Sequence, residues 1–367
     1  MERQSEPRVR VTTLETAPQL LYEHVGAQEV TQDTTATTNP EPGSPSVPER
    51  RRRSPLRRAG AIAGVVVLLI AAVFLWPLGK ESLQRATPRT LSFQAAESAA
   101  QAVVSADETN TEVQPSCRSL LRSHGLKRAK TVLMLHGYTA CPDQVAELAQ
   151  FFFDKGYNVY VPRAPRHGVI DKLAHADVTA DELVTYANES LNIAAGLGEE
   201  VGVIGQSGGG VLATWLAEYR GDAVDRLMVL SPFYQPASAH APAFAVKPLT
   251  VLFGFGLLPD HINGDGQSFH ALTQYLRIVK NYPDKPQRSS LQAVAVVTSV
   301  DDTSIDLPTA QDLPAALAAD TGASFVKDIV PSGQGLTHDI VGPTKSGGAA
   351  RRFYPRYFAL YEGSSPM

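Results

Sequence analysis

From residue 131 to the end of the chain, short apolar runs alternate with longer segments in which apolar side chains recur every three or four residues. The short runs predict strands at 131–135, 157–161, 201–204, 226–230, 293–298 and 325–330. The longer segments predict helices at 142–155, from 179 to about 195, directly after 207, at 269–280, at 307–319 and up to about 361. This alternation is typical of α/β domains, so the sequence predicts a mainly parallel sheet of about six strands with helices on both faces.

One segment, residues 235–290, interrupts this alternation. It begins with a run rich in Pro and Ala, continues through a strongly apolar stretch, and contains the predicted helix at 269–280. An apolar insertion between two strands is typical of a cap over the carboxyl ends of the strands. An ordinary connection with one core helix is the alternative.

The N-terminal part has a different composition. Residues 1–58 lack sustained hydrophobic periodicity and are rich in Thr, Pro, Ser and Glu, which predicts a disordered tail. Residues 60–79 carry no charge, and a helix of about 20 residues crosses the roughly 30 Å hydrocarbon core of a bilayer. We therefore predict a transmembrane helix over 59–79, with a buried core helix or a cleaved signal peptide as alternatives.

The charges beside this apolar segment predict its orientation. Six arginines lie between residues 50 and 58, whereas the residues just beyond 79 hold few cations. The positive-inside rule then places the N-terminus in the cytoplasm and everything after residue 80 outside it. Residues 80–115 are expected to form a stalk or linker with a peripheral helix at 91–104, leading into a globular domain over 116–367.

Composition argues against two classes of function, nucleic-acid binding and a structural zinc site. The net charge of −4 gives no indication of a nucleic-acid partner. The chain has two cysteines and no CxxC or Cys/His cluster, which argues against a structural zinc site. We expect no metal and no cofactor.

The strand at 201–204 leads into the motif Gly205-Gln206-Ser207-Gly208-Gly209, and an apolar helix follows. This is the G-x-S-x-G pattern in the strand–turn–helix context that it requires. Glycines on both sides of the serine permit a sharp turn that lifts the Ser207 hydroxyl out of the sheet. The pattern therefore predicts a serine nucleophile.

A serine hydroxyl needs a base to take its proton and an acid to orient that base. In a parallel sheet both belong in loops at the carboxyl ends of later strands. His338 is the histidine that follows the last predicted strand, and Asp301 and Asp302 follow the strand at 293–298. We predict His338 as the base and Asp302 as the acid, with Asp301 as the alternative acid.

An oxyanion hole requires two N–H groups aimed at the developing negative charge. The N–H of Gly208 is expected at the start of the helix after the nucleophile, and the N–H of Tyr138 in the loop after the first strand. His136 lies in the same loop, and we interpret it as a hydrogen-bonding residue of the loop rather than the base. His167 lies in the next such loop, where it either stabilises the loop or contacts substrate.

The two cysteines lie on either side of the first predicted strand. Cys117 precedes the strand and Cys141 is in the loop after it. Outside the cytoplasm a disulfide between them is expected, and it would brace the loop that carries Tyr138. Two free buried thiols are the alternative.

Five motifs together resemble the α/β-hydrolase superfamily, over roughly residues 115–362. More closely, they are similar to its bacterial carboxylesterase and monoacylglycerol-lipase-like branch. The motifs are TVLMLHGYTACPDQV, GYNVYVPRAPRHG, GQSGGG, TSVDDTSID and GLTHDIV. The resemblance implies an esterase for short or medium acyl chains, with Ser207, Asp302 and His338 as the triad and Tyr138 and Gly208 as oxyanion donors. The chain departs from many relatives at Gly208, where they carry a bulkier residue such as Met.

The function expected from the sequence is a membrane-anchored, esterase- or lipase-like serine hydrolase. Its partners would be a small-molecule or lipid ester and, through the single N-terminal helix, the membrane. A peptidase or amidase using the same triad is the alternative within enzymes. A non-catalytic binding module of the same fold is the alternative outside them.

Overall fold

A computed structural model of the chain describes residues 55–286 and 289–363. Within them, seven strands form one sheet in the order β1-β3-β2-β4-β5-β6-β7. β1 runs antiparallel to β3, and every other neighbouring pair is parallel. The strands are β1 (Leu120–Arg122), β2 (Arg128–Leu135), β3 (Asn158–Val161), β4 (Gly198–Gln206), β5 (Arg226–Leu230), β6 (Ala293–Ser299) and β7 (Ser324–Val330).

The sheet has one strand more than the six that the sequence predicts. The additional strand, β1, contains only three residues, and its antiparallel pairing to β3 places it at the edge of the sheet. Three residues are too few to display an alternating pattern, so the sequence carries no signal for β1. The prediction of about six strands was therefore wrong by this one strand.

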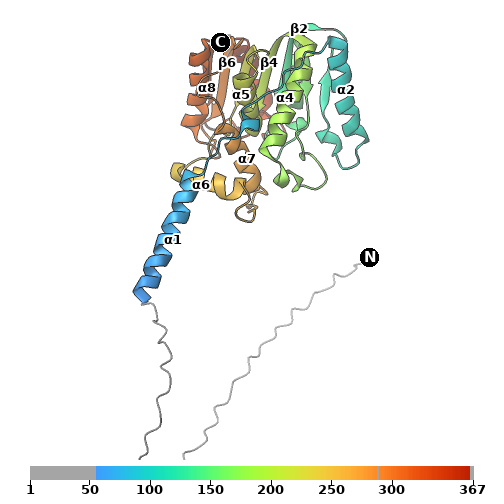
Figure 1. Ribbon diagram of the computed structural model, residues 1–367. Helices are drawn as coiled ribbons and strands as arrows, with labels where there is room; N and C mark the ends of the chain where they lie inside the picture. Colours follow the sequence, from blue (N-terminus) through green and yellow to red (C-terminus); the bar gives the residue numbers. More distant parts are fainter. Residues whose placement is uncertain (1–54, 287–288, 364–367) are drawn as a thin grey trace, which may run out of the picture. The chain divides into compact units, whose positions relative to one another are not determined.

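Alternate side chains of the central strands enter two separate hydrophobic cores, one on each face of the sheet. In β2, Leu133 and Leu135 contribute to one core and Val132 and Met134 to the other, as the twofold repeat of a strand dictates. The first face is covered by α2 (Phe93–Thr109), α4 (Ala180–Leu197), α5 (Gly208–Tyr219) and α8 (Leu307–Thr321) (Figure 1). The second face is covered by α3 (Ala146–Asp154) and α9 (Tyr354–Tyr361).

Local signals in the sequence explain where several of these helices begin. The Thr179 side chain accepts the N–H of Glu182, and the Glu182 carboxylate accepts the N–H of Thr179, which is the capping box that the sequence predicts. α8 begins after Asp306, whose carboxylate accepts the N–H of Thr309. The predicted helix at 142–155 instead divides into a short 3-10 turn, Pro142–Val145, and α3.

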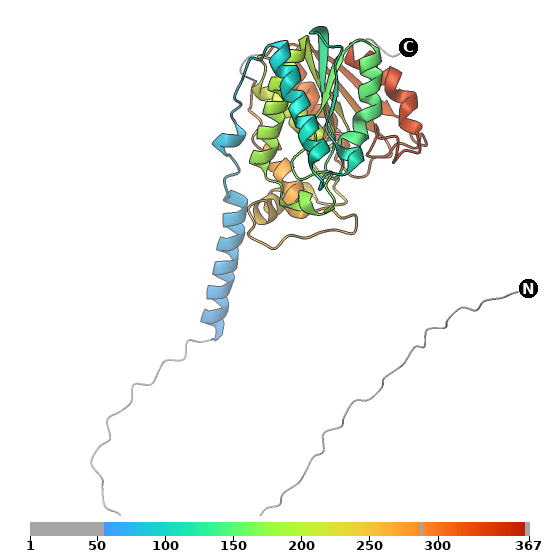
Figure 2. The same cartoon turned by 90° about the vertical axis from the view of Figure 1, so that its right-hand side faces the viewer.

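The insertion between β5 and β6 forms two helices, α6 (Ala243–Gly254) and α7 (Phe269–Val279). They pack against each other at one end of the sheet (Figure 2). α7 also contacts α5, the helix that follows the nucleophile motif. The insertion therefore lies beside the helix that follows Ser207, and the cap stays a prediction.

Residues 80–115 were expected to form a stalk or linker, but they pack against the domain. Leu83, Ala96 and Ala100 are completely buried in the first core. The indole N–H of Trp215 donates to the Leu83 carbonyl at 2.7 Å. The predicted peripheral helix at 91–104 corresponds to α2, and its small alanines permit close packing on α4.

The apolar segment at 59–79 overlaps α1 (Pro55–Leu75), which begins four residues before the predicted transmembrane helix and ends four residues before it does. Pro77 follows soon after that end, where its missing N–H prevents a helix from continuing. In the described part of the chain, no helix combines the length and the apolar character needed to cross a membrane. The predicted tail at 1–58 lies almost entirely outside the described residues.

Candidate functional site

Ser207 lies at the sharp turn between β4 and α5. Its backbone has φ 53° and ψ −114°, an uncommon conformation for a residue with a side chain. The turn is held by the Ser207 N–H, which donates to the Leu230 carbonyl at 2.9 Å, and by the Phe233 N–H, which donates to the Ser207 carbonyl at 3.1 Å. The strained turn presents the Ser207 side chain at the carboxyl end of β4.

The glycines of the motif are required because the backbone is crowded here. A Cβ atom on Gly205 would lie 2.2 Å from the Gly209 carbonyl oxygen. A Cβ atom on Gly209 would lie 2.1 Å from the Leu135 carbonyl oxygen of β2. Both contacts are to backbone atoms, so no side-chain movement could relieve them.

Ser207, His338 and Asp302 come from three loops and form one chain of hydrogen bonds. His338 Nε2 lies 2.8 Å from Ser207 Oγ, and His338 Nδ1 lies 2.9 Å from Asp302 Oδ2. The Asp302 side chain is fully buried, whereas that of His338 is 27% exposed. The other Asp302 oxygen accepts the N–H of Ser304 at 2.9 Å, so both carboxylate oxygens have partners.

Asp301, the alternative acid, points elsewhere. Its carboxylate accepts the Ser332 hydroxyl at 2.6 Å and the Gly333 N–H at 2.9 Å. These two hydrogen bonds hold the pKa of Asp301 below its usual range. Asp301 therefore does not contact His338, and the structure joins His338 to Asp302.

The two residues whose N–H groups are expected to form the oxyanion hole lie near Ser207. Gly208 is the first residue of α5, so its N–H has no partner within the helix. Gly137, next to Tyr138, lies so close that a Cβ on it would be 3.3 Å from Ser207 Cβ. Among the described residues, no protein acceptor takes the N–H of Tyr138 or of Gly208. Both groups therefore remain free to bind a ligand oxygen.

The two other histidines near this site hold loops together. His136 Nε2 accepts the N–H of Ala164 at 3.0 Å, and its Nδ1 donates to the Gly137 carbonyl. Burial, and then the neighbouring His167, lower the pKa of His136 to about 3. His167 donates from Nδ1 to the Pro165 carbonyl at 2.7 Å, and burial lowers its pKa to about 4. Both rings are therefore neutral near pH 7.

Three polar residues support the site and were missed by the sequence analysis. Gln144 accepts the Gly137 N–H at 2.8 Å and donates to Asp339 at 2.9 Å, which connects the loop of Tyr138 to the loop of His338. Gln206 donates to the His338 carbonyl at 2.8 Å. The contacts of Gln144 with Asp339 and of Gln206 with His338 each join residues more than 130 positions apart, so no local pattern could reveal them.

Cys117 and Cys141 form the predicted disulfide. Gly168 packs directly on it, since a Cβ at that position would lie 2.5 Å from Cys117 Cβ. The disulfide borders a cavity of about 460 Å³ that also includes Thr139 and Ala140, the two residues after Tyr138. The bridge thus ties the predicted oxyanion loop to the segment before β1.

The sequence profile described as the alpha/beta hydrolase fold matches residues 130–255, which include β2, the Ser207 turn and α6. The strand order, the parallel pairing and the serine at the β4–α5 turn agree with that match. The chain has the α/β-hydrolase fold. A search of curated protein sequences finds no match to this chain.

A solved structure extends the match in fold beyond residues 130–255. It comes from work on LipS and LipT, two metagenome-derived lipolytic enzymes. It has 18% identity, a TM-score of 0.53, and coverage of 68% of this chain and 99% of that chain. A monoglyceride lipase variant from Saccharomyces cerevisiae has 13% identity, a TM-score of 0.47, and coverage of 68% and 92%. Est1E from Butyrivibrio proteoclasticus, with bound ferulic acid, has 14% identity, a TM-score of 0.48, and coverage of 66% and 94%. At 18% identity the similarity to the first structure concerns the fold alone.

Proposed function

We propose that this α/β-hydrolase is a serine hydrolase that cleaves carboxylic esters through an acyl-enzyme intermediate. The observation that carries the proposal is the continuous chain of hydrogen bonds from Ser207 through His338 to buried Asp302. A serine in a strained turn, paired to a histidine that a carboxylate orients, is the arrangement that activates a hydroxyl as a nucleophile.

Each side chain has one task in the proposed reaction. His338 Nε2 takes the Ser207 proton while Ser207 Oγ attacks the ester carbonyl, and Asp302 stabilises the imidazolium that forms. The N–H groups of Tyr138 and Gly208 donate hydrogen bonds to the carbonyl oxygen as negative charge develops on it. His338 then gives its proton to the leaving alcohol. Water, deprotonated by His338, hydrolyses the acyl-enzyme and regenerates Ser207.

Labelling with a fluorophosphonate probe tests this proposal. The native chain should react, and Ser207→Ala should abolish the reaction. Ser231→Ala is a matched control, because Ser231 is also buried and also has a positive φ, of 42°. Labelling that persists in Ser207→Ala, or that is absent from the native chain, would contradict the proposal. p-Nitrophenyl esters of graded chain length, compared with p-nitroanilides, separate an esterase from an amidase.

The location is a second part of the proposal. We propose that residues 59–79 anchor the enzyme to a membrane, with the N-terminus in the cytoplasm and the hydrolase domain outside. The uncharged stretch at 60–79 and the six arginines between 50 and 58 support it. Protease added to intact cells should remove the hydrolase domain. Survival of the domain until the cells are lysed would contradict this orientation.

A further inference from the structure

The Tyr138 side chain makes contacts that the proposed reaction does not require, since only the N–H of this residue acts as an oxyanion donor. The Tyr138 hydroxyl accepts the N–H of Ser268 at 3.0 Å. It also lies 3.0 Å from His175 Nδ1. The Ser268 N–H can only donate, which leaves the hydroxyl proton available for His175 Nδ1 when that imidazole is neutral.

The burial of both side chains supports a hydrogen bond in which the Tyr138 hydroxyl donates to His175 Nδ1. Desolvation raises the pKa of the Tyr138 hydroxyl above its usual range. Desolvation also lowers the pKa of His175, against the opposing effect of Asp171 and Asp260. Both side chains therefore remain neutral around pH 7, and the hydroxyl has a donor on one side and an acceptor on the other.

Ser268 connects the Tyr138 hydroxyl to the cap. Ser268 is the N-cap of α7, where its side chain accepts the Ala271 N–H at 3.0 Å. Its own N–H lies before the first turn of the helix and needs a partner outside it, which Tyr138 supplies. The hydroxyl thus fixes the start of α7 to the loop after β2.

The same helix packs against the second oxyanion donor. Tyr275, in the middle of α7, lies so close to Gly208 that a Cβ there would be 2.8 Å from the Tyr275 ring. The rings of Tyr275 and Tyr138 have centroids 5.7 Å apart. One cap helix therefore contacts both residues whose N–H groups are expected to bind the oxyanion.

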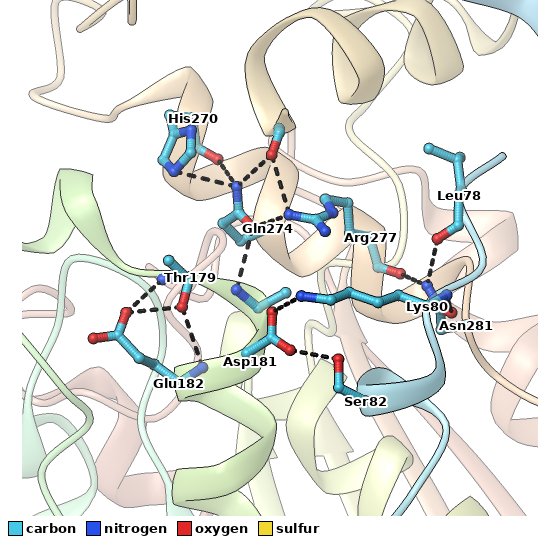
Figure 3. A network of polar contacts seen from close by, with 12 residues as sticks. Leu78, Lys80, Ser82, Thr179, Asp181, Glu182, His270, Gln274, Arg277 and Asn281 are labelled. Atoms are coloured by element: carbon cyan, nitrogen blue, oxygen red, sulfur yellow. Dashed lines mark hydrogen bonds and ion pairs between the residues drawn. The ribbon is translucent and has the colours of Figure 1, made fainter. Parts of the chain in front are cut away.

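The far end of α7 is held by polar contacts (Figure 3). The Asn281 side chain donates to the Leu78 carbonyl at 3.0 Å and accepts the Lys80 N–H at 2.8 Å. Gln274 accepts the Ala180 N–H at 3.2 Å, which joins α7 to the start of α4. With its C-terminal half held in this way, α7 is a rigid support for the groups at its N-terminus.

We propose that the Tyr138 hydroxyl is a positioning group that fixes the oxyanion loop to α7 and so sets both oxyanion donors relative to Ser207. This inference rests on the proposed function. Donors aimed at an oxyanion stabilise it only when they are held within a few tenths of an ångström. Without the hydroxyl, the Ser268 N–H and His175 lose their partner and the Tyr138 loop loses its tie to the cap.

Tyr138→Phe tests the proposal, because it removes the hydroxyl while keeping the ring and the backbone N–H. We expect kcat for a p-nitrophenyl ester to fall about 10-fold with little change in KM, less than the loss of a whole oxyanion donor. Tyr157→Phe is the matched control, since the Tyr157 hydroxyl bonds to Glu362, outside the site. A kcat within about twofold of wild type in Tyr138→Phe, or the same loss in both variants, would overturn the proposal.

His175→Ala and the double variant test whether the two side chains act together. If the hydroxyl works through its contact with His175, the double variant should lose no more than about the larger single loss. Fully additive losses would contradict that part of the proposal.

Hydrogen exchange gives a readout that does not depend on ester hydrolysis. In Tyr138→Phe, amide exchange should accelerate in peptides covering 136–145 and 205–215, as well as in the peptide that contains Ser268. Acceleration confined to the Ser268 peptide would overturn the proposal whatever the enzyme assay gives. If the wild-type chain hydrolyses no ester, but amide exchange still accelerates in all of these peptides in Tyr138→Phe, the result would contradict the proposed function alone.

Discussion

Asp302 and His338 are joined by a 2.9 Å hydrogen bond between Oδ2 and Nδ1, and the Asp302 side chain is fully buried. Its neighbour in the chain, Asp301, bonds instead to Ser332 and Gly333 on the loop after β7. Two adjacent carboxylates at the end of β6 therefore have different tasks. Asp302 contacts the histidine, whereas Asp301 ties two loops together.

The first prediction compares these two carboxylates. Asp302→Asn should lower kcat by a factor on the order of 10³ to 10⁴, because an amide cannot stabilise the imidazolium and favours the wrong tautomer of His338. Asp301→Asn should leave kcat within about twofold, since Asp301 has no contact with His338. Steady-state kinetics with a p-nitrophenyl ester measure both. Equal losses in the two variants would contradict the assignment of the acid.

The second prediction concerns the disulfide between Cys117 and Cys141, which are 24 positions apart. Replacing both cysteines by serine should lower the free energy of unfolding by about 3 kcal/mol in the chain-entropy model. Urea unfolding measures this difference. The chain has only two cysteines, so dithiothreitol should destabilise the wild type and leave the double variant unchanged. An effect of the reductant on the variant would show that the disulfide is not its target.

The third prediction concerns buried Glu218. Burial, and then the nearby charge of Asp320, raise the pKa of Glu218 to about 7. Because an exposed glutamate has a pKa of about 4.3, the unfolded chain releases this proton first as pH rises. The folded state is therefore progressively destabilised between about pH 4 and pH 7, by about 4 kcal/mol once the proton is lost from both states.

Glu218→Gln isolates this effect. The variant should unfold at a higher urea concentration than the wild type at pH 8, and the advantage should shrink at pH 5. Glu199→Gln is a suitable control, because Glu199 is exposed. An advantage of the same size at both pH values would show that packing, rather than titration of Glu218, is responsible.

The fourth prediction concerns the crowding around the Ser207 turn. Gly209→Ala places a methyl group 2.1 Å from the Leu135 carbonyl oxygen, so either β2 or α5 must move. We expect a loss of more than about 3 kcal/mol or no soluble protein. Gly264→Ala is the control, since a Cβ there meets no atom within 4 Å, and it should change stability by less than about 0.5 kcal/mol. Wild-type stability of Gly209→Ala in urea unfolding would contradict the close approach of α5 to β2.

Much of the fold follows from local patterns. The strand at 226–230 was predicted with its observed ends, and the capping box at Thr179 marks the start of α4 as expected. Two parts of the prediction were wrong: β1 was missed, and residues 80–115 are part of the domain rather than a linker. β1 is too short to have a pattern. The alanines of α2 are weak apolar signals that become core residues only because α4 lies against them.

Local patterns were enough to predict the alternation of strands and helices after residue 131, the sharp turn at Ser207, and the loops in which a base and an acid could lie. Apolar periodicity, glycines and caps act between residues close in the chain, so a linear sequence displays them. The choice of Asp302 over Asp301 as the partner of His338 required the folded structure. The two side chains point in different directions, and the packing of distant loops determines which of them meets the histidine. The folded structure alone brought the Tyr138 hydroxyl to Ser268, 130 positions away. Contacts of that range arise when elements pack together, and they leave no pattern in either segment.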